Sequence, residues 1–412
     1  MRQMHMRLFL SEKTSEQSRI TFWKDLTEEE FLVFLHKHKR IQDYWKNDPL
    51  FHISGIAQSM SRTRFLIILR ALHFSRNIDS KPNDRLYKIR PVINYFNERM
   101  DKVYYPGREL SLDECMVHWR GRLTFRQYIK NKKNKYGIKL YMLTDPKGMV
   151  LKFMVCSGTL GDFGGKGHTE KVVMHLLEGK LNCGHHVFMD NYYNSYNLSS
   201  QLSKMKTHST GTLKVDRKNS PAEVKSTKLK KGETIARYAN GVMIGKWKDA
   251  RDVTYISTEY KNELIEVKNR RKQVTFKPLP IVKYNKLMSK VDRQDQMVSY
   301  YNEERNNMRW PLKLFMHVME MCVSNSQILY NKYSEYKLPL YDFRVSVIKS
   351  LLPPFIVNTP ARPTPSASEH IVTVREDVNK NKKILRKKCR QCSLEGRCTD
   401  TIYECITCPD KA

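Results

Sequence analysis

The hydrophobic pattern of the chain changes at Glu109, and this change constrains the fold more than any other feature of the sequence. Before Glu109, apolar residues recur at helical spacing, as in SRTRFLIILRALHF, capped by Ser61, and in RPVINYFNERMDKVY, with Pro91 near its first turn. From Glu109, ELSLDECMVHW alternates apolar and polar residues, which is typical of a strand. Two more strand-like segments, GIKLYMLTD and MVLKFMVCSG, are joined by a predicted turn over residues 145–148.

Helices and strands alternate after these three segments. The helix HTEKVVMHLLEGKL precedes a short strand, HHVFMD, which ends at Asp190. The next helix, NSYNLSSQLSKMK, has Asn194 or Ser195 as its N-cap. In the region before Glu109, a further helix is predicted to begin at Thr27. Strands followed by alternating helices and strands predict an α/β fold.

Changes in composition predict the domain boundaries. Residues 216–283 are rich in lysine and carry short strand patterns, so they resemble a small β insertion. Helical spacing returns after it, and residues 337–383 combine proline with serine, threonine and lysine, as linkers do. The predicted units are a helical region at 1–108, an α/β core in two parts at 109–215 and 284–336, a β-rich insertion at 216–283, a linker at 337–383 and a cysteine-rich module at 384–412.

The charge of the chain limits its partners. Among 412 residues, 74 Lys and Arg oppose 42 Asp and Glu, which leaves a formal net charge of +32. A polyanion explains such an excess, with nucleic acid as the first candidate and a membrane surface as the second. No run of about 18 apolar residues is present, so we expect no transmembrane helix. The first residues lack the apolar stretch and cleavage site of a secretory signal.

Acidic residues on three predicted elements are the candidates for catalysis. Asp113 lies inside a strand, where aspartate is unfavourable, and Asp190 ends another strand. Asp292 and Asp295 are three residues apart on one face of a predicted helix. Carboxylates from three elements suit two divalent metal ions about 4 Å apart for phosphodiester chemistry. The alternatives are a solvent-facing strand acid for Asp113, a turn or cap residue for Asp190 and a solvated helix face for the last two.

Basic and aromatic residues alternate after the first predicted strand. This pattern suits a phosphate track with stacking positions, and the alternative is a solvated hairpin surface. The basic residues are Arg120, Arg122, Arg126, Lys130, Lys132, Lys133 and Lys135, and the aromatic residues are Phe125, Tyr128 and Tyr136.

Cysteines crowd the end of the chain. Cys389 and Cys392 form one CxxC pair and Cys405 and Cys408 another, with 12 residues between the pairs. Two such pairs predict a tetrahedral Zn²⁺ site, to which Cys398 is a possible further ligand. The alternative is a set of unrelated reduced thiols.

Several long motifs together resemble piggyBac-type transposases and their domesticated derivatives. They are SLDECMVHWRGRLTFRQYIKNKKNKYGIKLYML, MDNYYNS and YNKLMSKVDRQDQMVSYY, in the family's order and spacing. The resemblance covers roughly residues 20–350 and the cysteine-rich tail. It implies an RNase H-like catalytic core interrupted by an insertion, with a dimerisation and DNA-binding region before it.

The resemblance also implies an activity and its site. The essential acids of the family fall on Asp113, Asp190 and Asp292, with Asp295 as a further acid, and they bind Mg²⁺ or Mn²⁺. The implied reaction is cut-and-paste transposition at TTAA targets through hairpin-ended intermediates. Arg309 and Trp310 resemble a pair that lies near the DNA ends, although a tryptophan that simply opens a helix fits equally well.

Three departures from the family pattern keep other functions open. Ser289 and Lys290 stand where the family commonly has Gly-Gly, so a lysine lies close to Asp292. The tail ends four residues past Cys408, so we expect a truncated zinc module, and the first residues also fall short of the family's long N-terminal region.

The leading hypothesis is that the protein is a nuclear, homodimeric transposase that binds double-stranded DNA and has no membrane or small-molecule partner. The alternatives are a domesticated nuclear DNA-binding or chromatin protein without strand cleavage, and a basic RNA-binding protein with a zinc ribbon.

Overall fold

A computed structural model describes most of the central part of the chain and short pieces of its end. The described residues are 45, 59–76, 84–130, 135–158, 163–268, 273–288, 309–351, 372–379, 383–388 and 400–405. The chain divides into two compact units, Met1–Pro353 and Pro354–Ala412, and each is treated by itself. The helix predicted from Thr27 lies outside the described residues.

Within the described residues, two α-helices precede the sheet, as the sequence predicts. Helix α3 spans Arg62–Ala71, and the Ser61 hydroxyl caps it by accepting a hydrogen bond from the Arg64 backbone N–H at 3.2 Å. Helix α4 spans Arg90–Val103 and has a proline in its first turn. Each buries one apolar face, so these two helical segments are confirmed.

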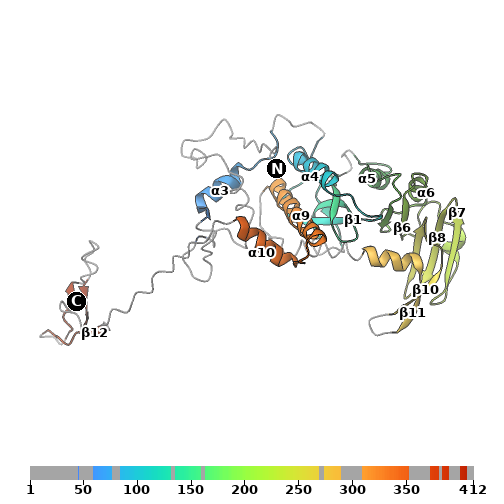
Figure 1. The fold of residues 1–412 in the computed structure, drawn as a ribbon. Helices are drawn as coiled ribbons and strands as arrows, with labels where there is room; N and C mark the ends of the chain where they lie inside the picture. Colours follow the sequence, from blue (N-terminus) through green and yellow to red (C-terminus); the bar gives the residue numbers. More distant parts are fainter. Residues whose placement is uncertain are drawn as a thin grey trace. The chain divides into compact units, whose positions relative to one another are not determined.

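The described residues form a sheet of nine strands with the order β2-β3-β1-β5-β6-β9-β8-β7, and β4 also pairs with β3 (Figure 1). Strand β1 is antiparallel to β3 and parallel to β5, which is parallel to β6. The bounds of the nine strands are β1 Glu109–His118, β2 Gln127–Tyr128, β3 Tyr136–Thr144, β4 Val150–Val155, β5 His186–Met189, β6 His208–Thr212, β7 Thr234–Ala239, β8 Val242–Lys248 and β9 Asp252–Ser257. The strands predicted between Glu109 and Asp190 are confirmed as β1, β3, β4 and β5, whereas β2 and β6 were not predicted.

Helices pack on the sheet and share one core with it. They are α5 (His168–Leu176), α6 (Tyr196–Lys204) and α9 (Trp310–Tyr333), besides α3 and α4. Asn97 of α4 hydrogen-bonds both backbone groups of Phe153, at 2.9 and 3.0 Å. Asn325 of α9 does the same for Val150, at 2.8 and 3.0 Å. The half-buried Asn97 and the buried Asn325 thus tie strand β4 to helices α4 and α9.

The N-cap of α6 is one of the two predicted residues. The Ser195 hydroxyl accepts a hydrogen bond from the Leu198 backbone N–H at 3.1 Å. The Asn194 side chain instead donates to the carbonyls of Met189 and Thr212, at 2.8 and 2.9 Å. Asn194 therefore ties the ends of β5 and β6 together.

The lysine-rich insertion continues the main sheet. Strand β9 pairs antiparallel with β6, with Thr210 opposite Ser257, so β7, β8 and β9 extend the core sheet. A short helix, α7 (Ala222–Ser226), precedes them. Strands β10 (Leu264–Lys268) and β11 (Val274–Pro278) form a separate two-stranded sheet, and a helix described over 279–288 follows. The short strand patterns predicted for this segment are confirmed at β7, β8, β9 and β10.

The segment predicted as a linker is partly folded. Helix α10 spans Leu340–Leu351, buries Leu340 and Phe343, and makes a double ion pair between Arg344 and Glu320 of α9. The linker prediction is therefore wrong for these residues, because apolar and charged contacts to α9 hold them in a helix. No helix in the described ranges is long and apolar enough to span a membrane.

The second unit contains short paired strands. Strand β12 (Val372–Val374) pairs antiparallel with β15 (Tyr403–Cys405), and β13 (Lys387–Lys388) pairs with β14 (Asp400–Thr401). Strand β12 precedes the predicted start of the tail module at 384. The paired part of the tail thus includes residues that the sequence assigned to the linker.

Candidate active site and DNA-binding surface

Two of the predicted catalytic acids stand on neighbouring strands. The parallel pairing of β1 with β5 runs up to Leu112 opposite Met189, and Asp113 and Asp190 are the next residues of each segment. Asp113 is 9% exposed, and one of its carboxylate oxygens accepts a hydrogen bond from the Glu114 N–H at 2.8 Å. Asp190 accepts one from the Tyr192 N–H, also at 2.8 Å. The structure therefore brings these two acids to adjacent positions.

A third carboxylate and a buried phenol join them. The Tyr193 hydroxyl donates to a carboxylate oxygen of Glu114 at 3.2 Å, and Tyr193 is fully buried. Burial raises the pKa of Tyr193, and the charges of Glu114, Asp113 and Asp190 raise it further. All three carboxylates thus lie near one hydroxyl. Neither Glu114 nor Tyr193 was predicted as a site residue, although both lie inside the quoted motifs.

The electrostatics of the site favour a cation. The pKa of Asp190 is raised, first by burial and then by the nearby negative charge of Glu114. The hydrogen bond from the Tyr192 N–H and the positive charge of Lys139 act in the opposite direction. Lys139 is buried, and its ammonium group lies 4.3 Å from the ring centroid of Tyr192. Buried like charges are costly unless a positive charge offsets them.

The other two predicted acids, Asp292 and Asp295, lie outside the described residues. Within the described ranges, no three His, Cys, Asp or Glu side chains are arranged to hold a metal ion. Leu287 and Met288, the last described residues of helix 279–288, pack against Phe188 of β5. The metal pair stays a prediction.

The predicted phosphate track is exposed where the structure describes it. Tyr128 of β2 and Tyr136 of β3 are 54% and 47% exposed, with ring centroids 4.8 Å apart. The Arg126 guanidinium lies 5.3 Å from the Tyr136 centroid. Lys132 and Lys133 lie outside the described residues. The exposed basic residues are Arg120, Arg122, Arg126, Lys130 and Lys135.

Arg309 and Trp310 have roles inside the protein. The Arg309 guanidinium donates to the carbonyls of Leu69 and Arg70 at 3.1 Å, and also to that of Leu72, at the end of α3. Trp310 opens α9 and packs edge-on against Phe125 at 5.3 Å. The structure therefore favours the alternative reading of a tryptophan that opens a helix.

The zinc prediction falls almost wholly outside the described residues. Cys389, Cys392, Cys398 and Cys408 are not among them, and only the backbone of Cys405 is described, in β15.

Comparison with known proteins defines the class. A family model described as Transposase IS4 matches residues 5–327, so the chain belongs to this transposase family. Within it the chain is of the piggyBac type, as the motifs predict.

Two human proteins and one solved structure carry the comparison. PiggyBac transposable element-derived protein 3 is 26% identical over 353 residues, which cover 78% of this chain and 58% of that protein. PiggyBac transposable element-derived protein 2 is 25% identical over 312 residues, which cover 70% and 52%. The chain thus spans just over half the length of these curated relatives.

The solved structure is a cryo-EM piggyBac transposase synaptic complex with hairpin DNA. It matches with a TM-score of 0.71 and 24% identity, over 83% of this chain and 75% of that one. This likeness shows that the two chains share a mixed α/β fold.

Proposed function

We propose that this protein is a DNA transposase that binds transposon-end DNA and performs metal-dependent strand cleavage and transfer at TTAA targets. The observation that carries the proposal is the pair Asp113 and Asp190, which follow in-register residues of two parallel strands. Glu114 adds a third carboxylate beside them. A cluster of three acids, of which Asp113 is buried and the other two are half-buried, suits phosphoryl transfer better than it suits packing.

The strand order supports an RNase H-like core. Strands β1, β3 and β4 are consecutively paired and antiparallel, and β5 and β6 then add on the other side of β1, parallel to it and to each other. Helix α5 lies between β4 and β5 in the chain, and α6 lies between β5 and β6. The acids then stand on the central strand and on its parallel neighbour.

The residues present fit a divalent metal. The carboxylates of Asp113, Asp190 and Asp292 would hold Mg²⁺ or Mn²⁺, with Asp295 as a further acid. The fit rests on the raised pKa of Asp190 and the nearby charge of Glu114, which a divalent cation would offset. When bound, the metal supplies a Lewis acid for the attacking and leaving oxygens. The chain itself orients Asp113 through the Glu114 N–H and Asp190 through the Tyr192 N–H.

The partner is double-stranded DNA. The excess of 74 basic over 42 acidic side chains supplies long-range attraction to phosphate. The exposed Tyr128 and Tyr136, flanked by the basic residues of the predicted track, offer stacking surfaces. Arg309 hydrogen-bonds carbonyl groups at the end of α3, so we do not include it among the proposed DNA contacts. A nuclear location, a homodimer and a Zn²⁺ site at Cys389, Cys392, Cys405 and Cys408 complete the proposal.

A domesticated DNA-binding protein without cleavage is the second candidate. Lys290 stands two residues before Asp292, where the family commonly has glycine, and the buried Lys139 already supplies positive charge near Asp190. Both cations would weaken the need for a metal. This candidate keeps the DNA-binding surface and loses only the chemistry.

An in-vitro nicking assay separates the two candidates. The purified chain is mixed with Mg²⁺ or Mn²⁺ and a duplex that ends in the matching terminal repeats. Nicks at the repeat end, followed by hairpin products, support a transposase. Binding without any nick supports the domesticated alternative.

A further inference from the structure

A mostly buried lysine stands beside the candidate active site. Lys139 of β3 is 7% exposed, and it shares a sheet face with Tyr141, which is directly opposite Glu114 of β1. Its ammonium group lies 4.3 Å from the ring centroid of Tyr192 and 4.7 Å from that of Tyr141. The Tyr192 N–H donates to the Asp190 carboxylate, so one residue contacts both the lysine and an acid of the site.

Both tyrosine rings are held in place. The Tyr141 hydroxyl lies 2.8 Å from Nε2 of His168, whose Nδ1 lies 2.6 Å from the carbonyl oxygen of Phe163. Because a carbonyl oxygen only accepts, Nδ1 carries the proton and Tyr141 donates to Nε2. The Tyr192 carbonyl accepts a hydrogen bond from the Arg217 guanidinium. The ammonium group is therefore positioned over two fixed rings, whose faces attract a cation.

The ammonium group of Lys139 has no anionic partner within the described residues. No hydrogen bond or ion pair of its Nζ is found there, and its charge acts on Asp190 without an ion pair between the two groups. The Nζ is also not one of the buried side-chain atoms that lack a hydrogen-bond partner, so this atom itself reaches solvent. A mostly buried charge is costly unless an opposite charge offsets it.

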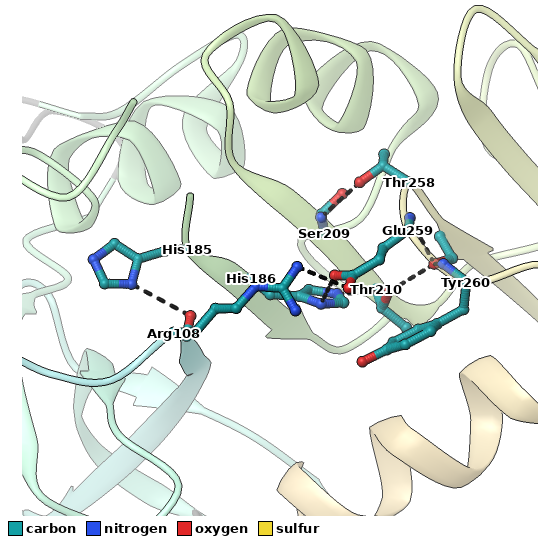
Figure 2. Close-up of polar contacts among 9 residues, drawn as sticks. Arg108, His185, His186, Ser209, Thr210, Thr258, Glu259 and Tyr260 are labelled. Atoms are coloured by element: carbon teal, nitrogen blue, oxygen red, sulfur yellow. Dashed lines mark hydrogen bonds and ion pairs between the residues drawn. The ribbon is translucent and has the colours of Figure 1, made fainter. Parts of the chain in front are cut away.

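Several other basic side chains of the described chain are paired. The buried Lys180 donates to a carboxylate oxygen at 2.7 Å, and the buried Lys246 donates to two backbone carbonyl groups, at 3.1 and 2.5 Å. Just before β1, the Arg108 guanidinium forms an ion pair with Glu259 at 2.7 Å, and Glu259 also lies close to the buried His186 (Figure 2). The ammonium group beside the acids therefore differs from these, and it is available to an anion from outside the protein.

We propose that Lys139 contacts a phosphate of the bound DNA at the candidate active site and thereby takes part in strand cleavage. An ammonium group forms a strong, charge-assisted hydrogen bond with a phosphate oxygen, and it offsets the negative charge that develops there during cleavage. A DNA phosphate is the anion that the net charge of +32 attracts and that neighbouring carboxylates with a metal ion would process. This inference rests on the proposed function, because it takes DNA as the substrate of this site.

DNA binding without Mg²⁺ or Mn²⁺ tests the inference apart from cleavage. The probes are a terminal-repeat duplex and versions of it in which an uncharged methylphosphonate replaces, in turn, each phosphate at the repeat end. Lys139→Met keeps a long, unbranched side chain beside the two rings but removes the charge. At one position we expect the methylphosphonate to weaken binding of the wild type by about 10-fold and to leave binding of Lys139→Met nearly unchanged.

Lys180→Met is the matched control. Lys180 is also buried, and its ammonium group lies 5.6 Å from the ring centroid of Tyr105, but it is paired with Asp101. This variant should respond to each methylphosphonate as the wild type does. Melting temperatures show whether the variants fold. If Lys139→Met does not fold, Lys139→Gln replaces it, and if neither folds, the ammonium group serves the fold itself and the proposed role is wrong.

The outcomes separate this inference from the proposed function. A folded Lys139→Met that loses as much affinity as the wild type at every methylphosphonate position overturns the phosphate contact, while tight binding of the normal duplex upholds DNA as the partner. Nicking of the duplex by this variant in Mg²⁺ at the wild-type rate also overturns the role in cleavage. If the wild type does not bind the terminal-repeat duplex, the proposed function fails and the inference falls with it.

Discussion

Asp113 and Asp190 stand at the same level of two parallel strands, each one residue beyond the in-register pair of Leu112 and Met189. Adjacent strands are about 4.8 Å apart, so the backbone pairing itself places the two residues side by side. Their distance therefore depends on the β1–β5 ladder and on the close packing of β5 against β6. Changes that disturb this packing should disturb the site.

Replacing Gly211 with alanine should break this packing. A Cβ at Gly211 would lie 1.8 Å from the Met189 carbonyl oxygen and 2.5 Å from the Asn194 amide nitrogen. We expect a loss of about 3 kcal/mol or more in unfolding free energy, because the backbone cannot yield at that point. Urea denaturation of the wild type and of Gly211→Ala measures this loss in unfolding free energy.

The control for Gly211 is Gly107→Ala. A Cβ at Gly107 would meet no atom within 4 Å, so this variant should unfold like the wild type. Equal stability of the two variants would contradict the close approach of β5 and β6.

His317 should make the stability of the fold depend on pH. Burial, with the charge of Lys313, lowers the pKa of His317 to about 4 from an ordinary 6.5. Below pH 6.5 the His317 side chain becomes protonated in the unfolded chain but stays neutral in the folded chain. The free energy of unfolding therefore decreases as the pH falls from 6.5 to 4. The loss from this one group is about 1.4 kcal/mol per pH unit within that window.

His317→Gln should remove this part of the acid sensitivity, and His73→Gln, at an exposed position, should keep it. Urea unfolding at several pH values between 7 and 4 measures the difference. Parallel stability curves for the wild type and His317→Gln would show that His317 is not held neutral.

The sequence predicts the regular elements better than it predicts contacts between them. Strand β6, HSTGT, was missed because its mostly small, polar side chains do not alternate with apolar ones. Its Gly211 leaves room for the Met189 carbonyl group and the Asn194 side chain to lie close to the β6 backbone. Helix α10 was assigned to a linker because prolines surround it, although Phe343 and Arg344 anchor it on α9.

The same limit applies to the candidate site. Asp113 could be predicted because aspartate is unfavourable inside a strand, and Asp190 because strand ends in α/β sheets collect functional groups. Glu114 could have been found as the neighbour of Asp113. The contact between His186 and Glu259 joins residues 73 positions apart in the sequence, and no local sequence pattern predicts it.

DNA binding should depend strongly on salt. If about 6 phosphates are contacted, affinity should fall by about 1,000-fold between about 50 and 200 mM salt. Replacing both Arg122 and Lys130, two exposed residues of the predicted track, with glutamine should lower the slope of log affinity against log salt by about 2.

The control removes two exposed charges elsewhere, at Lys230 and Lys231. It should leave the slope nearer to that of the wild type. Equal slopes for the two double variants would place the phosphate contacts outside the predicted track, and a flat salt response would contradict nucleic-acid binding altogether.

The cysteine-rich tail should carry zinc in the full chain. Mass spectrometry of metals should find Zn²⁺ in the wild type and none in Cys405→Ser, because three thiolates do not close a tetrahedral site. A structural zinc contributes on the order of 10 kcal/mol to folding, so the tail should lose its amide dispersion in chelator. Cys183→Ser, at an exposed free cysteine, is the control and should retain the metal. Full zinc content in Cys405→Ser would show that Cys398 or another ligand belongs in the set.

Strand cleavage by Asp113→Asn tests the central claim most directly. Asparagine keeps the size of the side chain and an oxygen for the Glu114 N–H, but it loses the charge that a metal needs. With terminal-repeat DNA and Mg²⁺, the account predicts nicking by the wild type, nicking reduced about 1,000-fold or more by Asp113→Asn, and equal DNA affinity for both. Asp216→Asn, at an exposed aspartate, should nick like the wild type. Undiminished nicking by Asp113→Asn, or no nicking by the wild type despite tight DNA binding, would contradict the assignment of this site as a transposase active centre.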